Sequence, residues 1–415
     1  MKKTDMIFAL LFMFCVFTGN ALAGTEGSDN TFYGSGAGAA TVGDRAATFI
    51  GANAGLKNST GSMNTFVGSY AGKDNTTGLA NTFLGEGAGE HSTTSNENTF
   101  LGTEAGKMNT TGQYNTFLGS NTGINNTTGA YNTFLGTHAG YSNVTDNNNI
   151  FIGHRAGYTN NGGNNNTFTG TNAGFYNTTG IRNTFIGSSS GLNNTTGSYN
   201  SALGFSSGNA NTTGNYNTYF GYAAGNKNTG GSYNLFIGNY AGFSNLTGNS
   251  NTSLGYMAGY SATGSGNVFL GNQAGYNETG SNKLYIDNSS TALPLIAGDF
   301  SANTVRINGT LTQSSSREYK DDITDLSSQE AMDTLEGLNP VKYVYKEGSH
   351  EQHVGFIAED VPQLVAATDR KGLSTMDIVA VLTKVVQEQQ GFIQEQQKSI
   401  LALREELNYI KEKVR

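Results

Sequence analysis

The sequence predicts a mainly β protein: a parallel β-solenoid, or β-roll, of 17-residue repeats, then a short β neck, then an α+β domain that ends in a coiled coil. Three observations support this. Glycines recur every 17 residues from Gly34 to Gly255, the period stops near residue 280, and apolar residues recur at spacings of three and four after residue 379. A fixed period is typical of repeat architectures, in which each repeat packs only against its neighbours.

Each repeat has the chemistry of a short strand followed by turns. A second glycine series lies four residues after the first, and together they define 15 repeats. Residues 115–119 read Asn-Thr-Phe-Leu-Gly, in which Thr, Phe and Leu favour a strand and glycine ends it. The Asn-Thr-Thr-Gly segment that follows is turn chemistry. One repeat buries too little to be stable alone. We therefore expect one coil per repeat, a stacked apolar stripe, asparagine ladders and a rise of roughly 4.8 Å per coil.

Composition and charge restrict the function classes. Glycine accounts for 58 of 415 residues, and charged residues for only 13%. The net charge of -8 argues against nucleic acid as a partner, because a phosphate-binding face needs clustered Lys and Arg. The repeats contain almost no acidic residues, which disfavours calcium binding. The Gly-x-x-x-Gly spacings belong to the repeat and form no phosphate-binding motif. We expect no cofactor and no metal.

The first 23 residues have the pattern of a signal peptide. A basic start is followed by an apolar run at 6–17 and a small-x-small cleavage site at 21–23. The run is too short to span a bilayer. We expect the mature chain to begin near Gly24 and to be secreted or held at the cell surface. Cys15, the single cysteine of the sequence, lies inside this segment, so the mature chain would have no disulfide.

The composition changes after residue 280. Residues 281–314 lose the period and contain two strand-like segments, 283–287 and 303–309, which predict a β neck that protects the open edge of the solenoid. Charged residues rise from 15 of 247 over 34–280 to 30 of 100 over 316–415. The expected divisions are therefore a signal peptide at 1–23, a repeat shaft at 24–280, a neck at 281–314 and a C-terminal domain at 315–415.

The end of the chain predicts a coiled coil over residues 379–414. Apolar residues occupy positions a and d of five unbroken heptads, and Gln389 and Gln396 fill two d positions. A single amphipathic helix on a local core is the alternative. The β-branched a positions also suit a dimer, so the expectation of a trimer depends on the resemblance described next. We call the apolar set the seam: Val379, Leu382, Val386, Ile393, Ile400, Leu403, Leu407, Ile410 and Val414.

Over about residues 30–280 the repeats resemble the head repeats of trimeric autotransporter adhesins. The shared pattern is Asn-Thr-Phe-Leu-Gly-x-x-Ala-Gly, although the family's repeat is usually slightly shorter. The resemblance implies a left-handed parallel β-roll in which three chains pack together. It also favours adhesion or spacing as the role, with a cell-surface or glycan ligand that the sequence does not identify. Ice binding by regular threonine arrays, and passive length without a ligand, stay open as alternatives. The many Asn-x-Thr sequons are expected to be repeat chemistry.

The C-terminal domain resembles the endosialidase-type intramolecular chaperone auto-processing domain. The resemblance is carried by the segment 314–323, by Leu-Asn-Pro at 338–340, by the segment 353–362 and by the long helix. In that family a Ser-x-x-x-x-Lys pair forms a Ser-Lys dyad, and the domain assists trimer assembly before cutting itself off. The resemblance therefore implies that Ser315 is the nucleophile and Lys320 the general base, with a cut between Ser314 and Ser315.

Two positions depart from the family pattern. Ser316 replaces the usual acidic residue, and Glu318 replaces the usual arginine. Ser314 and Ser316 are rival nucleophiles, but Ser315 has the family spacing. The alternative function is a permanent fibre whose C-terminal domain trimerises without cutting.

Local geometry sets further expectations. A spacing of five does not place two side chains on one helical face, so we expect Ser315 in an extended or turn segment that leads into a helix. A lysine acts as a base only when burial or nearby cations make it neutral, and trimer formation would supply that burial. Asp321 and Asp322 are expected to be helix-start acids. His350 and His353 are not expected to be catalytic.

Overall fold

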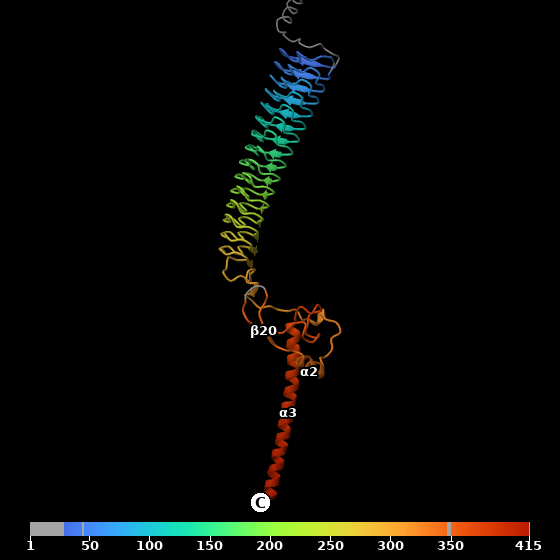
Figure 1. The fold of residues 1–415 in the computed structure, drawn as a ribbon, viewed down its shortest axis with the longest axis vertical. Coiled ribbons are helices and arrows are strands. Elements are labelled where there is room, and N and C mark those ends of the chain that lie inside the picture. Colours follow the sequence, from blue (N-terminus) through green and yellow to red (C-terminus); the bar gives the residue numbers. More distant parts are fainter. Residues whose placement is uncertain (1–28, 44, 347–349, 415) are drawn as a thin grey trace, which may run out of the picture. The chain divides into compact units, whose positions relative to one another are not determined.

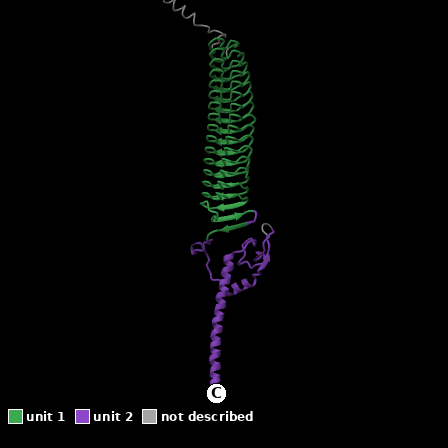
Figure 2. Cartoon of the chain, turned by 90° about the vertical axis from the view of Figure 1, so that its left-hand side faces the viewer, with its two compact units in different colours: residues 1–300, 304–309 green, residues 301–303, 310–415 purple. Residues whose placement is uncertain are grey.

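The computed structural model describes residues 29–43, 45–346 and 350–414, so the predicted signal peptide and Cys15 lie outside the described residues. The chain divides into two compact units, which are coloured separately in Figure 2. The first contains residues 1–300 and 304–309, and the second contains residues 301–303 and 310–415. The first unit is a β-solenoid, whereas the second holds helices α2 and α3 (Figure 1).

Each repeat forms one coil with one three-residue strand. Consecutive strands pair in parallel with equivalent residues opposite each other, so Phe100 lies opposite Phe117 and Leu101 opposite Leu118. The predicted parallel β-solenoid is confirmed. Its strands are β1 (Thr31–Tyr33), β2 (Thr48–Ile50), β3 (Thr65–Val67), β4 (Thr82–Leu84), β5 (Thr99–Leu101), β6 (Thr116–Leu118), β7 (Thr133–Leu135), β8 (Ile150–Ile152), β9 (Thr167–Thr169), β10 (Thr184–Ile186), β11 (Ser201–Leu203), β12 (Thr218–Phe220), β13 (Leu235–Ile237), β14 (Thr252–Leu254) and β15 (Val268–Leu270).

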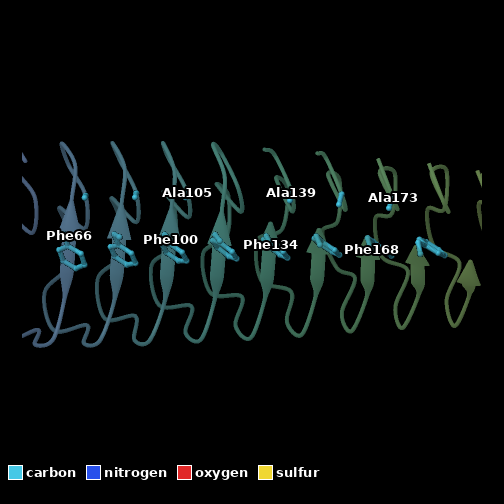
Figure 3. Packing of buried hydrophobic residues seen from close by; sticks show 14 of the residues in the cluster. Phe66, Phe100, Ala105, Phe134, Ala139, Phe168 and Ala173 are labelled. Atoms are coloured by element: carbon cyan, nitrogen blue, oxygen red, sulfur yellow. The ribbon is translucent and has the colours of Figure 1, made fainter. Parts of the chain in front are cut away.

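A column of stacked aromatic rings forms the core of the solenoid. Phe100, Phe117 and Phe134 are fully buried, and successive ring centroids are 4.8 Å apart. Figure 3 shows rings of this column, such as Phe100 and Phe134, and the alanines that directly precede the second glycine of most repeats, such as Ala105 and Ala139. The rings repeat at the spacing of strands in a sheet, so the backbone ladder and the core are satisfied by the same rise per coil. The outer two side chains of strands β4 to β7 and β10 are exposed, and in most of the other repeat strands one of the two is partly buried.

Two ladders of buried asparagines satisfy the polar interior. The Asn115 Oδ1 atom accepts a hydrogen bond from the Asn132 backbone N–H at 3.0 Å, and its Nδ2 donates to the Gly129 carbonyl at 2.8 Å. In the second ladder Asn126 Nδ2 donates to Asn109 Oδ1 at 2.8 Å. Buried amides avoid a large desolvation penalty only when they are hydrogen-bonded in this way. Asn109 and Asn126 also begin Asn-x-Thr sequons and are fully buried, as expected if these sequons are repeat chemistry.

The two glycine series serve different contacts. Gly102 has a φ of +137°, and a Cβ atom there would lie 2.5 Å from the carbonyl oxygen of Gly119 in the next coil. Gly106 has a φ of +59°, and a Cβ atom there would lie 2.5 Å from the Phe100 ring. The first series therefore permits the close approach of coils, and the second makes room for the core ring.

Three further strands complete the sheet after the last repeat. Strand β16 (Lys283–Ile286) pairs in parallel with β15, and β17 (Ile296–Asp299) and β18 (Thr304–Ile307) add to it antiparallel. The sequence predicted the first and last of these strands but missed β17, whose Ile-Ala-Gly-Asp sequence has only weak strand propensity.

Glu278 occupies the position of the second ladder in the last coil, after Ala262 has interrupted the asparagines. Its Oε1 accepts a hydrogen bond from the Gly280 N–H at 2.6 Å. Its Oε2 accepts a hydrogen bond from the Tyr285 hydroxyl. Burial and this neighbouring carboxylate raise the pKa of Tyr285 to about 12. The carboxylate thus takes the position that an asparagine amide holds in most coils.

The second unit is a small α+β domain. Helix α2 (Ser328–Glu336) begins at the Ser327 cap, and α3 (Thr375–Lys413) begins at the Ser374 cap, four residues before the predicted start of the coiled coil. Strands β19 (Val341–Tyr343) and β20 (His353–Gly355) form an antiparallel pair. The core of the second unit consists of Ala331, Leu338, Val361, Val365, Val381 and Val385.

Replacing Phe117 by alanine should lower the local stability of the solenoid by about 3–5 kcal/mol, because it removes a buried ring and leaves a cavity that neighbouring coils cannot fill. Leu118→Ala in the same strand should have a much smaller effect, since that side chain is partly exposed. Urea unfolding of both variants, followed by circular dichroism, tests this. Equal shifts of the two midpoints would contradict a core centred on the ring column.

Asp146 is a buried acid at a turn position that is glycine in most repeats. Its side chain is 3% exposed, and its Oδ2 accepts hydrogen bonds from the Gly162 N–H at 2.7 Å and from Asn160 Nδ2 at 3.0 Å. Burial raises the pKa of Asp146 above the ordinary value of 3.8, against the opposing effect of the backbone N–H groups of Gly162 and Gly163.

The ionised form of Asp146 should therefore lower stability at neutral pH, and this loss should disappear as the pH falls through the raised native pKa towards 3.8. Asp146→Asn should raise the urea midpoint at pH 7 relative to the unchanged chain, and the difference should vanish near pH 3.8. Urea titrations of both chains across this range measure the difference. A gain that is the same at every pH would mean that charge is not its cause.

Candidate functional site

The predicted dyad lies in a long exposed segment of the second unit. Residues 310–325 are exposed throughout, and their one helical element is the single 3-10 turn η1 (Arg317–Tyr319). Ser316 caps this turn in an extended conformation, and its hydroxyl accepts a hydrogen bond from the Glu318 N–H at 3.2 Å. Lys320 ends the turn, and its backbone N–H donates to the Arg317 carbonyl.

The turn brings Ser315 and Lys320 into direct contact. The Lys320 Nζ atom donates a hydrogen bond to Ser315 Oγ, with 2.6 Å between the two atoms. The two side chains meet although they are five residues apart, because the chain reverses around one short turn. Ser315 lies immediately before the cap of this turn, and Lys320 lies after its end. The contact is of the length that proton transfer between the two groups requires.

The three neighbouring serines differ in their partners. Ser315 Oγ contacts the lysine, whereas Ser316 Oγ is engaged as the cap of η1. The Ser316 hydroxyl is held by the backbone, so this arrangement favours Ser315 over Ser316 as the partner of Lys320.

The expectation for the following acids was wrong. Asp321 and Asp322 do not begin a helix: η1 has ended before them, Asp322 has a φ of +52°, and α2 starts only at Ser328. Ser327 provides the cap of α2 by accepting a hydrogen bond from the Glu330 N–H at 3.2 Å. The Ser327–Glu330 spacing was a capping signal present in the sequence.

The two histidines lie apart from the dyad contact. His350 is exposed, and His353 belongs to β20, where its ring stacks on Tyr343 with 5.8 Å between centroids. Within the described part of the chain, no group of three or more His, Cys, Asp or Glu side chains is arranged to hold a metal ion. The helices in that part include none with the length and apolar character needed to cross a membrane.

Apolar side chains accompany the dyad in the exposed segment. Leu311, Tyr319 and Ile323 are 79%, 73% and 51% exposed. Exposed apolar residues gathered in one segment are typical of a surface that another chain covers.

Comparison with protein families agrees with the predicted class of this domain. Residues 315–369 match the family model described as chaperone of endosialidase, and this match follows a long β-solenoid of 17-residue repeats. The matched segment begins at Ser315 and includes Lys320. No curated protein and no solved structure matches the chain significantly.

Sequence reasoning missed one feature of the first unit. A cavity of about 150 Å³ lies at the end of the repeats and is lined by Tyr276, Glu278, Tyr285, Ser290 and Thr291, among others. The signal that was available is Glu278 itself, an acid at a ladder position that carries asparagine in most repeats.

Proposed function

We propose that the chain is a secreted, trimeric surface fibre whose C-terminal domain assists assembly and then cleaves itself from the shaft in front of Ser315. The observation that carries this proposal is the 2.6 Å contact between Lys320 Nζ and Ser315 Oγ, at the start of the segment that matches the chaperone family. Residues 1–23 would direct export, and the solenoid would serve as an adhesive or spacing shaft.

The chemistry is a single intramolecular acyl transfer. Neutral Lys320 accepts the proton of the Ser315 hydroxyl, and Ser315 Oγ attacks the carbonyl carbon of Ser314. The bond from that carbon to the Ser315 nitrogen breaks, and the nitrogen takes the proton back from Lys320. The product is an ester between Ser314 and Ser315 Oγ. Water then hydrolyses this ester, which leaves a carboxylate on Ser314 and a free amine and hydroxyl on Ser315.

Assembly would control the acyl transfer by removing water from Ser315 and Lys320. In one chain Ser315 and Lys320 are both exposed to water. A lysine acts as a base only as the neutral amine, and cover of the segment 310–325 by neighbouring chains would remove water and favour that form. The exposed apolar side chains Leu311, Tyr319 and Ile323 supply an apolar surface for that contact. Cleavage would therefore wait for assembly.

Helix α3 has two apolar faces, which supports self-association. Val381 and Val385 are 1% and 5% exposed and pack in the core of their own domain. The seam residues lie on another face and are between 42% and 82% exposed. The first apolar face of this helix is covered by its own domain, and the second continues with a heptad spacing. Such a helix fits a coiled coil between chains.

The solenoid offers a matching apolar row. The last residue of each strand points outward from the coil, and Leu84, Leu101, Leu118 and Leu135 are 37–42% exposed. Parallel pairing in register places these side chains in one line along the sheet. Three copies that meet through this row would share an apolar axis along the shaft.

Ser315→Ala and Lys320→Ala should each abolish release of a C-terminal fragment of 101 residues, 315–415, because either change removes a member of the dyad. Denaturing gels with intact mass of the expressed full chain measure the release. Ser314→Ala and Ser316→Ala are the controls and should still release the fragment. Intact chains in every case would support the alternative, a permanent fibre with a non-cleaving trimerisation domain.

Ile400→Asp should weaken trimer formation, because it places a charge in the middle of the seam. The measurement is light scattering after size exclusion, in the Ser315→Ala background so that the chain stays intact. Lys398→Asp, a change on the same helix outside the seam, should leave the mass unchanged. In the cleaving background Ile400→Asp should also slow fragment release. A full trimer mass for Ile400→Asp would show that the seam is not the contact between chains.

A further inference from the structure

The last coils of the solenoid carry a connected surface of six aromatic rings. Tyr222 stacks on Phe205 with centroids 5.4 Å apart and meets Tyr240 edge to face at 5.1 Å. Tyr240 contacts Phe243 at 5.7 Å. Phe243, Tyr260 and the next ring then stack at 5.0 Å spacings. We call this set the aromatic ridge: Phe205, Tyr222, Tyr240, Phe243, Tyr260 and Tyr276.

The fold does not require aromatic residues at these positions. The repeat position of Tyr222 is occupied by Ser188 in an earlier coil, and that of Tyr240 by Ser206. Tyr240 and Ser206 share the same left-handed backbone, with φ values of +58° and +52°. Tyr240 contacts the rings of Tyr222, Phe243 and Tyr260, whereas Ser206 shows that the coil backbone forms without a ring at this position.

The ridge ends at the cavity found beside the neck. Tyr276, its last ring, lines this cavity of about 150 Å³ together with Tyr285, Glu278 and the loop at 290–292. The cavity thus combines aromatic surface with a carboxylate and with serine and threonine side chains. An apolar surface with a few convergent polar groups is the usual composition of a small-molecule site.

The surroundings of the ridge are almost without charge. Between residues 183 and 282 the sequence contains two charged side chains, Lys227 and Glu278. The Lys227 Nζ atom lies 4.9 Å from the centre of the Phe243 ring. Without a basic cluster, this surface does not suit nucleic acid or an anionic membrane. Near the cavity Lys283 is paired with Asp299 at 2.5 Å, and Glu278 in the cavity disfavours an anionic ligand further.

We propose that the aromatic ridge and the cavity at its end bind a neutral polysaccharide. Because these rings stack on one another, their edges are left for a ligand, and the apolar C–H groups of sugars can contact these edges while the sugar hydroxyls hydrogen-bond with tyrosine hydroxyls and with the Glu278 carboxylate. A ridge that repeats every 5.0 Å from coil to coil suits a polymer, and the cavity suits one terminal sugar. The inference specifies the ligand class for the adhesive part of the proposed function and does not depend on cleavage.

The test is affinity electrophoresis of the full chain through native gels that contain one polymer each. The probes are hydroxyethylcellulose and galactomannan, which are neutral, and alginate, which is anionic. We expect retardation by at least one neutral polymer and none by alginate. Tyr240→Ser and Tyr260→Asn introduce residues that other coils already carry at the same positions, and each should weaken binding about tenfold.

Matched controls separate the possible failures. Tyr131→Asn removes an exposed stacked tyrosine from another row, where the next coil carries Asn148, and should bind like the unchanged chain. Ser315→Ala should also bind normally, so a failure of self-cleavage leaves this test intact. Retardation by no neutral polymer, or by alginate alone, would overturn the proposal. A loss of oligomer mass in the ridge variants would instead assign the ridge to contact between copies of the chain.

Discussion

The in-register stacking of coils is the constraint on which the solenoid depends. Strands hydrogen-bond at one spacing, and the 4.8 Å between core rings shows that every interior group repeats at that spacing. A side chain that differs from its neighbours changes the local spacing of the rings: Tyr219, which follows Ala202 in the column, lies 5.8 Å from Phe236. One requirement, a common rise per coil, therefore explains three features of the repeat. These are glycine at the coil contact, asparagine in the ladders and phenylalanine in the column.

The same constraint leaves the outer surface free to vary. In the early coils the outer positions carry ion pairs, such as Lys57 with Asp74 at 2.9 Å and Lys73 with Glu90 at 3.1 Å. In the last coils equivalent corners carry the aromatic ridge. The core column also changes there, since Ala202, Tyr219 and Ser253 take the places that phenylalanine holds in the early coils. Differences between coils on a constant scaffold are where binding functions are expected in repeat proteins.

In the C-terminal domain the candidate site depends on local contacts and not on stacking between repeats. Its dyad is held by a single turn in an exposed segment, so the 2.6 Å contact is local and owes little to the domain core. Local geometry can align a nucleophile and a lysine, but it cannot exclude water from them. The site therefore has the hydrogen bond between serine and lysine but lacks the burial that a neutral lysine needs. That combination connects the proposed chemistry to assembly, because partner chains are the available source of burial.

The sequence alone determined what is periodic or local. The 17-residue period required a solenoid, the alternation of outward and inward residues followed from the strand, and the Ser-x-x-x-x-Lys spacing identified the pair that the turn brings together. Only the tertiary structure decided what depends on groups distant in the chain. Strand β17 exists because β16 offers it an edge, and Asp146 is buried because the next coil covers it. The ridge likewise joins Tyr222 to Tyr276 across coils. The period determines the structure that all coils share. The aromatic ridge and the burial of Asp146 depend on contacts between neighbouring coils, which the period does not specify.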